Sequence, residues 1–291
     1  MHVAVLGNPK SWYCRDLARA LRERGHRYTR VDFPKLVAEI GAVAAPLRAG
    51  QTDLSAVDAV IVRTMPPGSL EQVVYRMDAL QRLEAAGVVV LNPPKAIECA
   101  VDKYLTTCRL EAAGLNVPDT CVCETADAAL EAFERLGGDV VVKPLFGAEG
   151  RGIVRVSDPD LALRTFRTLE RIQTVLYVQR FIEHEGFDVR VLVLDGRVVG
   201  SIRRRSPHDF RTNVSRAAVA ELHEATERER DWSLRAAAAT GTRFAGVDLL
   251  YGREGQCYVI EVNAVPGWQA FRKATGIDVA ALIVDSVQRL S

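Results

Sequence analysis

The chain has 291 residues, which is long enough for roughly two domains with a substantial buried core. Its 38 lysine and arginine residues and 37 aspartate and glutamate residues leave a formal net charge of +1. This balance excludes a protein that attracts nucleic acid or an anionic membrane over its whole surface, so any anion must be bound locally.

The longest apolar runs, such as Val88–Leu91 and Val189–Leu194, have the length of strands and not of a membrane span. The N-terminus begins with a strand pattern and has no signal-peptide layout, so we expect a cytoplasmic protein. The 6 cysteines are scattered and form no CxxC pair, which favours reduced thiols over a disulfide or zinc framework.

Strand-length apolar runs and amphipathic helices alternate over residues 1–91. This alternation is typical of an open parallel α/β sheet. The turn Gly7-Asn8-Pro9-Lys10 lacks both the GxGxxG and the GxxxxGK[ST] phosphate loops, so dinucleotide-binding and P-loop functions have weak support. The expected strands are His2–Gly7, Tyr28–Phe33, Ala59–Arg63 and Val88–Leu91, and the expected helices run from Ser11 to Gly25 and over Leu70–Ala86.

Asn92-Pro93-Pro94 interrupts the alternation. Paired prolines favour an extended linker, so we expect a domain boundary here. The pattern that follows predicts one long helix over Lys95–Ala113. Further on it predicts strands over Val117–Cys123 and Thr174–Gln179 and helices over Ala126–Leu136, Pro159–Arg171, Ala225–Ala239 and Asp278–Leu290.

A lysine follows the strongly apolar predicted strand Asp139–Val142. Lys143 at the exit of a buried strand is costly unless an anion receives its charge. The segment that follows, Phe146-Gly147-Ala148-Glu149-Gly150-Arg151-Gly152, contains three glycines, which free the backbone amides to face phosphate oxygens and to move as a lid. Such loops are also ordinary turns, but the preceding lysine favours phosphate binding.

Asp195-Gly196 is the strongest hairpin signal in the chain and joins the predicted strands Phe187–Leu194 and Arg197–Arg204. Arginines crowd the segment after it. A focused guanidinium cluster suits bidentate contact with a carboxylate or a transferring phosphoryl group, whereas the alternative is a solvated basic loop. The cluster comprises Arg203, Arg204, Arg205, Arg211 and Arg216 with Asn213 among them, and we assign Arg204 and Arg216 to solvent.

A second predicted hairpin, with strands Val247–Tyr251 and Cys257–Asn263, has a four-residue turn. In this register Asp248 lies opposite Val259, so Asp248, Glu261 and Asn263 share one face. Two carboxylates and one amide oxygen suit a hard cation such as magnesium rather than zinc. The alternative is a hairpin whose polar face lies in water.

Eight motifs follow one another along the chain: Asp102-Lys103, Val142-Lys143-Pro144, the Gly147–Gly152 loop, Gln179–Ile182, Asp188-Val189-Arg190, Arg211-Thr212-Asn213, Gly246-Val247-Asp248 and Glu261–Gly267. In this order they resemble the motifs of the ATP-grasp ligases. The resemblance is closest to the RimK-like branch, which attaches amino acids, often glutamate, to a carboxylate. Each motif alone is weak, whereas the ordered set is specific and covers nearly the whole chain.

The resemblance implies an ATP-grasp fold in three parts and ATP with Mg²⁺ or Mn²⁺ as cofactors. The parts are a pre-ATP-grasp domain over 1–93, a central domain with the lid over 94–181, and a C-terminal domain with the magnesium site over 182–291. In family terms, Lys103 and Lys143 hold phosphates beside Gly147, Gly150 and Gly152; Arg180 and Phe181, flanked by Gln179 and Ile182, present backbone groups to adenine; Asp188 takes the ribose; Arg211, Thr212 and Asn213 lie by the triphosphate; and Asp248, Glu261 and Asn263 bind magnesium.

The sequence departs from the family pattern at a few positions. Ala148-Glu149 in the lid replaces a more usual hydroxyl or amide pair, and Arg180 stands where relatives often carry an acidic residue. The N-terminal part matches only loosely, and Arg63 and Arg76 are its candidates for holding acceptor carboxylates.

The implied reaction joins a carboxylate to an amine. The acceptor carboxylate attacks ATP to give an acyl phosphate and ADP, while Lys143 and Arg203 or Arg211 neutralise the spreading charge; the amine then displaces phosphate. The arginine cluster favours glutamate as the amine, and the acceptor is a peptide, a carrier protein or a small cofactor such as a pterin. We expect a homo-oligomer that binds neither nucleic acid nor membrane. The alternatives are a phosphotransferase that stops after the first step and a non-catalytic ATP-binding protein.

Overall fold

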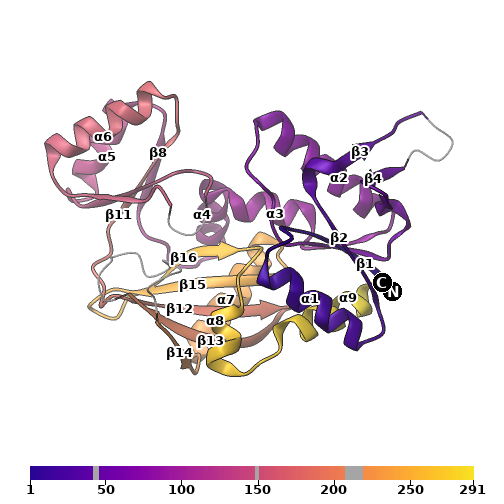
Figure 1. The fold of residues 1–291 in the computed structure, drawn as a ribbon. Coiled ribbons are helices and arrows are strands. Elements are labelled where there is room, and N and C mark those ends of the chain that lie inside the picture. The colour runs from indigo at the N-terminus through magenta and orange to yellow at the C-terminus, as the bar shows by residue number, and fades with distance from the viewer. Residues whose placement is uncertain (42–45, 148–150, 207–218) are drawn as a thin grey trace.

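The computed structural model describes residues 1–41, 46–147, 151–206 and 219–291. Within these ranges the chain forms three units, each built around one sheet, and a further small sheet (Figure 1). The predicted mixed α/β architecture is confirmed. No helix in the described ranges has the length and apolar character that a bilayer crossing requires.

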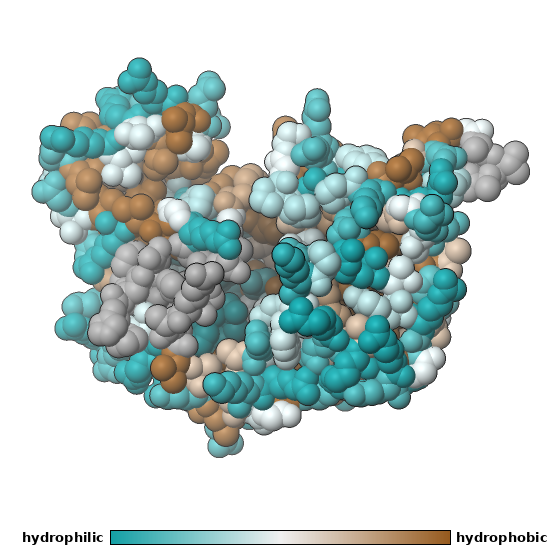
Figure 2. Space-filling view, viewed as in Figure 1, coloured by the Kyte–Doolittle hydropathy of each residue, from teal (hydrophilic) through white to brown (hydrophobic). Residues whose placement is uncertain are grey.

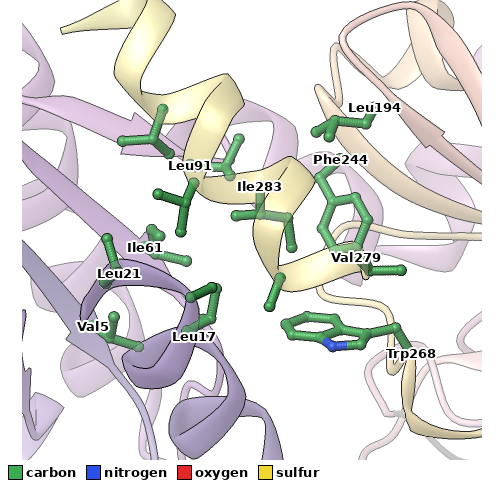
Figure 3. Packing of buried hydrophobic residues seen from close by; sticks show 14 of the residues in the cluster. Val5, Leu17, Leu21, Ile61, Leu91, Leu194, Phe244, Trp268, Val279 and Ile283 are labelled. Atoms are coloured by element: carbon green, nitrogen blue, oxygen red, sulfur yellow. The ribbon is translucent and has the colours of Figure 1, made fainter. Parts of the chain in front are cut away.

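The first unit is a parallel sheet in the order β2-β1-β6-β7, which confirms the sheet predicted from the alternation. On one face Val3 and Val5 of β1 pack against helices α1 and α9, so the C-terminal helix contacts the N-terminal strand (Figure 3). On the other face Ala4 and Leu6 pack against α2. The elements are β1 His2–Leu6, α1 Trp12–Glu23, β2 Arg27–Val31, β6 Ala59–Val62, α2 Leu70–Ala85, β7 Val89–Leu91 and α9 Val279–Leu290.

A small antiparallel sheet between β2 and β6 was not predicted, because each of its strands is too short to show a period. Its strands are β3 Leu36–Ala38, β4 Leu47–Ala49 and β5 Thr52–Asp53, with single 3-10 turns at Phe33–Lys35 and Leu54–Ala56. Figure 2 shows apolar surface around β3 and β4, where Val37 is 50% and Ile40 91% exposed.

The predicted linker at Asn92–Pro94 is wrong. The Asn92 side chain is buried and bonds to four backbone groups: its Nδ2 donates to the carbonyls of Phe244 and Ala264, and its Oδ1 accepts from the amides of Arg243 and Phe244. Pro94 begins a helix, where its missing N–H costs nothing. The predicted helix Lys95–Ala113 is two helices, α3 Pro94–Val101 and α4 Lys103–Ala112, because Asp102 caps α4 through the Leu105 amide.

The second unit is an antiparallel sheet in the order β10-β9-β11-β8 with helices α5 and α6 on one face. Val140 and Val142 of β9 face these helices, so Val141 and Lys143 face the opposite way. On the same face, opposite to α5 and α6, lie Tyr177 and Gln179 of β11. The elements are β8 Thr120–Cys123, α5 Ala126–Arg135, β9 Val140–Lys143, β10 Val154–Val156, α6 Pro159–Arg171 and β11 Leu176–Arg180.

The third unit is an antiparallel sheet in the order β14-β13-β12-β15-β16. Helix α7 covers one face, which is apolar, and the opposite face carries charged side chains. The Asp195-Gly196 turn joins β12 to β13 as predicted, with φ of +48° and +69°. The elements are β12 Phe187–Leu194, β13 Arg197–Arg205, β14 Val219–His223, α7 Glu227–Thr240, β15 Phe244–Tyr251, β16 Cys257–Asn263 and α8 Gln269–Thr275.

Candidate functional site

The charged face of the third sheet is built by cross-strand pairs. Arg190 of β12 lies opposite Asp248 of β15, and Asp248 lies opposite Glu261 of β16. Asp188 of β12 lies opposite Arg204 of β13. Because side chains directly opposite one another point to the same face, these five residues form one charged cluster on four neighbouring strands.

The arginines of this cluster bind its aspartates through paired contacts. Arg190 donates from Nε and Nη2 to the two oxygens of Asp248, each over 2.6 Å. Arg204 donates to both oxygens of Asp188 over 2.7 and 2.6 Å, and its Nη2 lies 2.9 Å from Asp248. Both aspartates are fully buried. Bidentate pairs of this kind fix the orientation of guanidinium groups as well as neutralising them.

These contacts outweigh the cost of burial for the aspartate–arginine pairs. Burial alone would raise the pKa of Asp248, but the charges of Arg190 and Arg204 hold it below its usual range. Burial likewise opposes the charged form of Arg204, yet Asp248 and Asp188 raise its pKa above the ordinary arginine value. Both groups are therefore ionised at neutral pH.

Glu261 is the member of the cluster that lacks such compensation. Within the described ranges no hydrogen bond or ion pair links its side chain to another residue. Burial and the neighbouring Asp248 raise its pKa, and this effect outweighs Arg190, Lys103 and Arg204. A carboxylate beside another carboxylate in a buried place is stable when a cation lies between them.

Asn263 adds an amide oxygen at the end of β16, opposite Gly246. Its Oδ1 accepts the Val265 amide over 2.8 Å, which leaves one lone pair for another partner. Across the described part of the chain, no three His, Cys, Asp or Glu side chains gather in a metal-binding arrangement. The donor set Asp248, Glu261 and Asn263 consists of two carboxylates and an amide, and this hard-oxygen chemistry fits magnesium.

The predicted register of this hairpin is wrong, although the face it predicts for Glu261 is right. Tyr251 pairs with Cys257, so the turn has one more residue than predicted, and a bulge between Asp248 and Leu249 shifts the register again. Two shifts of one residue restore the original face, because side chains alternate with a period of two. Without the bulge, Glu261 would face the apolar core beside Val247.

A bulge also explains why Arg203 was wrongly assigned to the site and Arg204 to solvent. Counting back from the two-residue turn puts Arg203 opposite Asp188, but the register shifts between Leu192 and Val193 and brings Arg204 there instead. Arg204 is only 8% exposed. Arg203 lies on the opposite face, with its guanidinium 4.5 Å from the Phe187 ring. Strand alternation gives no sign of either bulge. The pairing of Arg190 with Asp248 was missed for another reason: β12 and β15 are far apart in the sequence, so no short turn fixes their register.

The two predicted lysines lie where the second unit meets the charged cluster. Lys143 donates from Nζ to Gln179 Oε1 over 2.6 Å, and Gln179 is held in turn by Thr120 Oγ1 at 2.8 Å. Lys103 donates to the Gly147 carbonyl over 2.9 Å. Burial lowers the pKa of Lys143 to about 8, and it also lowers that of Lys103, while the charge of Glu261 raises both.

The strand end predicted to meet adenine has its amides already engaged. The Arg180 amide donates to the backbone carbonyl of Asp119, and the Phe181 amide donates to that of Asp139, so neither amide is free to donate to a base. Arg155 lies 3.6 Å from the Phe181 ring centroid, and the side chain of Ile182 lies close to Gly252. Asp188, predicted to take a ribose, is bonded by Arg204 through both oxygens.

Some predicted residues cannot be placed. Gly150, Arg211, Thr212 and Asn213 lie outside the described residues. Gly147 and Gly152, on either side of the gap at 148–150, are exposed and have φ of +154° and +74°, which L-residues rarely adopt.

Solved structures with the same architecture are ATP-grasp ligases. The ligase PsnB complexed with a minimal precursor has a TM-score of 0.79 at 23% identity, covering 100% of this chain and 99% of that one. D-cycloserine synthetase DcsG has a TM-score of 0.77 at 19% identity, covering 100% of both chains. The chain has the ATP-grasp fold.

Sequence comparison identifies the branch. The RimK PreATP-grasp domain matches residues 1–97 and the RimK-like ATP-grasp domain matches residues 100–287. The chain belongs to the RimK-like ATP-grasp family, whose members are ATP-dependent carboxylate–amine ligases, and the predicted enzyme class is confirmed.

Two curated relatives cover nearly the whole chain. The tetrahydromethanopterin:alpha-L-glutamate ligase of Methanosarcina acetivorans is 33% identical over 98% of this chain and 98% of its own length. The ribosomal protein bS6–L-glutamate ligase of Salmonella paratyphi B is 32% identical over 99% of this chain and 96% of its own.

Proposed function

We propose that the chain forms an amide between the amine of glutamate and a carboxylate of a peptide, protein or pterin-type acceptor, at the expense of ATP. The observation that carries this proposal is the position of Glu261, a half-buried carboxylate that makes no hydrogen bond or ion pair within the described ranges, beside Asp248 and within electrostatic range of Lys103 and Lys143. The names of the relatives support glutamate as the amine and leave the kind of acceptor open.

Asp248, Glu261 and Asn263 would hold the magnesium ion. Bound there, magnesium would neutralise charge on the phosphate oxygens of ATP. Glu261 needs such a cation, because burial and Asp248 together raise its pKa. Asp248 would share its oxygens between the ion and Arg190, since each carboxylate oxygen has two lone pairs.

The cationic side chains would do the electrostatic part of the chemistry. Lys103 and Lys143 would bind phosphate oxygens, and the hydrogen bond from Lys143 to Gln179 holds its ammonium group in place. Arg190 and Arg204, with Arg211 outside the described residues, would stabilise the charge that spreads over the transferring phosphoryl group. Arg203 has no part in this proposal, because it lies on the opposite face of β13.

The acceptor carboxylate would attack the γ-phosphorus of ATP, releasing ADP and giving an acyl phosphate. The glutamate amine would then attack the acyl carbon, expelling phosphate. Because acyl phosphates hydrolyse readily, the glycine-rich segment from Gly147 to Gly152 would exclude water during both steps.

Other features stay proposals with their own measurements. We propose domains at 1–93, 94–181 and 182–291, of which the first boundary lies at Pro93 beside the helix start of α3. Limited proteolysis followed by mass spectrometry would locate these boundaries. We also propose a cytoplasmic homo-oligomer, which fractionation and light scattering would check.

The decisive experiment incubates the enzyme with Mg-ATP, glutamate and a panel of acceptors. The panel contains a peptide with a glutamate C-terminus, ribosomal protein bS6 and a pterin that bears a carboxylate. We expect ADP in proportion to an acceptor that gains the mass of one glutamyl residue. ADP without any amide would favour a phosphotransferase, and neither product from any acceptor would contradict the proposal.

A further inference from the structure

A second charged place lies outside the cluster described above, at the carboxyl ends of β1 and β6. Arg63 directly follows β6, and Gly7 directly follows β1. The two positions are close, since a Cβ added to Gly7 would lie 3.2 Å from Arg63 Cβ. In the order β2-β1-β6-β7 this is where the connections change direction, the place at which open α/β sheets bind ligands.

Among the described residues, Arg63 is a buried cation that no anion neutralises. It is 6% exposed, and its Nε is buried with no hydrogen-bond acceptor. Within the described ranges the guanidinium makes one hydrogen bond, from Nη2 to the Pro266 carbonyl over 3.0 Å, and no carboxylate pairs with it. Burial lowers its pKa to about 10.

The acidic groups near Arg63 do not neutralise it. The Asp16 carboxylate is bound to Trp268 Nε1 at 2.9 Å, Arg272 at 2.6 Å and Arg19 at 2.9 Å. Burial raises the pKa of the Cys14 thiol, so this group is neutral at physiological pH. A buried charge that lacks a partner is unfavourable by itself and is retained where a ligand supplies the counter-charge.

The chemistry of the Arg63 side chain favours one kind of ligand. Its guanidinium carbon lies 4.9 Å from the Tyr13 ring centroid and 4.4 Å from that of Trp268, so two aromatic rings pack against the guanidinium group. The N–H groups of a guanidinium project in its own plane, and they match the two oxygens of a carboxylate.

The Arg63 site adjoins the charged cluster through a short chain of contacts. Arg63 bonds to Pro266, and Pro266 packs so closely on Gly246 that an added Cβ there would lie 2.8 Å from Pro266 Cβ. The same added Cβ would lie 3.6 Å from Arg190 Nε, and Arg190 binds Asp248. Arg63 therefore stands beside the reaction centre without being part of it.

We propose that Arg63 binds a non-reacting carboxylate of one of the two substrates, the acceptor or glutamate, and so positions that substrate for amide formation. This inference rests on the proposed ligase function. Arg76, the other candidate in the first unit, is a weaker one: it donates to the Pro66 carbonyl over 2.7 Å and lines a separate cavity of about 380 Å³ with Tyr75, Pro66, Pro67, Phe33 and Gln72.

The test compares Arg63→Lys and Arg63→Met with the wild type and with Arg76→Met as the matched control. Three amines are compared. Glutamate has both an α- and a γ-carboxylate, glutamine lacks the γ-carboxylate, and 4-aminobutyrate lacks the α-carboxylate. We expect the Arg63 variants to raise KM for glutamate or for the acceptor about 10–100-fold, the factor that one charge-assisted hydrogen bond represents, with KM for ATP unchanged.

The pattern of KM values identifies the carboxylate. If Arg63 binds the α-carboxylate of glutamate, Arg63→Met should abolish the preference of the enzyme for glutamate over 4-aminobutyrate. If it binds the γ-carboxylate, the preference over glutamine should disappear. A rise in KM for the acceptor alone would assign Arg63 to the acceptor, and Arg63→Lys should restore part of the affinity in each case.

Several results would overturn the inference. Equal KM values in all variants, or a fall in melting temperature with all KM values rising in step, would mean that Arg63 only ties β6 to the segment after β16. If the wild type forms amide and Arg63→Met forms it with the same kinetics, the role of Arg63 is refuted and the proposed function stands. A wild type that forms no amide would overturn the proposed function and this inference with it.

Discussion

At the scale of single residues, Lys143 shows how burial sets a functional charge. Burial lowers its pKa from 10.5 to about 8. Between these two values the unfolded chain holds a proton that the folded chain has released, so this group makes the fold more stable as pH rises through that window. Below about pH 8 the buried ammonium group is a cost to stability, which a bound phosphate would offset.

Replacing Lys143 should therefore separate stability from activity. We expect Lys143→Met to melt no lower than the wild type at pH 7 while turnover falls about 10²–10³-fold, the usual effect of losing one donor to a developing anion. Lys143→Arg should not restore turnover, because a planar fork and a point charge differ in reach. In the wild type, KM for ATP should rise above about pH 8 as Lys143 loses its proton. Unchanged ATP affinity in Lys143→Met would contradict this role.

The two carboxylates of the proposed magnesium site should respond differently to substitution. Asp248→Asn leaves Arg190 and Arg204 buried beside a neutral group, and breaking a buried pair costs about 3–5 kcal/mol of stability. Glu261→Gln removes a carboxylate whose pKa burial and Asp248 raise, so its ionised form is a cost at pH 7 and the variant should be at least as stable as the wild type.

Both variants should lose turnover. The change in melting temperature on adding Mg²⁺ then tests whether the loss comes from metal binding. The wild type should melt higher when Mg²⁺ is added, and Glu261→Gln should lose this rise. Asn116→Ala, which removes one hydrogen bond to the Cys257 carbonyl away from the carboxylates, serves as the control and should keep the rise. A Mg²⁺-dependent rise that persists in Glu261→Gln would exclude Glu261 as a ligand.

At the scale of elements, much of the fold followed from the sequence because long elements repeat their periodic signal. The parallel strands, helices α5, α6 and α9 and the turn at Asp195-Gly196 lie within a few residues of the predicted positions. The bulges in β12–β13 and β15–β16 give no such signal, because each is a single extra residue. The first bulge decides that Arg204 and not Arg203 faces Asp188, and the second decides that Glu261 faces Asp248, so the site was less predictable than the sheet that carries it.

The glycine-rich segment allows a prediction at the same scale. Gly152 has φ of +74°, and a side chain there would also lie 3.4 Å from Pro144 Cγ. Gly152→Val should therefore distort the segment that we propose excludes water. Amide formation should fall more than ADP release, because phosphoryl transfer can continue while the acyl phosphate hydrolyses.

The quantity to measure is the ratio of amide to ADP. Gly196→Val is the matched control: it imposes a similar strain at φ of +69° in the β12–β13 turn, where nothing lies within 4 Å of the added Cβ. The control should keep the wild-type ratio. If amide and ADP decline in step in Gly152→Val, the segment serves to bind ATP and not to exclude water.

At the scale of the whole molecule, the first and third units are held together by buried contacts and not by a flexible linker. A shared core joins Val3 and Val5 of β1 to Leu192 of β12, Phe244 of β15 and Ile283 of α9 (Figure 3). Ion pairs at its edge join α1 to the C-terminal segment, from Arg19 to Asp278 and from Arg24 to Asp285. Arg63 lies at this same junction, so the site we propose for a carboxylate is set by the packing of these two units.

Asn92 is the polar contact on which this junction depends. Its amide satisfies two carbonyls and two amides at the start of β15 and after β16. Asn92→Ala would leave several of these buried groups without partners, each at a cost of about 1–3 kcal/mol. We expect the variant to lose about 3 kcal/mol or more in denaturant unfolding. Asn116→Ala, which removes one partly buried bond, should lose less than half as much.

The same substitution should alter substrate binding selectively. Ala264, whose carbonyl Asn92 holds, is two residues from Pro266, which accepts the hydrogen bond from Arg63. Loosening this segment should raise KM for the carboxylate substrate that Arg63 binds. KM for ATP should rise less, because Lys103 and Lys143 are held by the second unit and α4, and only Asn263, next to Ala264, is disturbed at the proposed magnesium site. If KM for ATP rises as much as KM for both carboxylate substrates, the junction supports the whole reaction centre and does not act through Arg63.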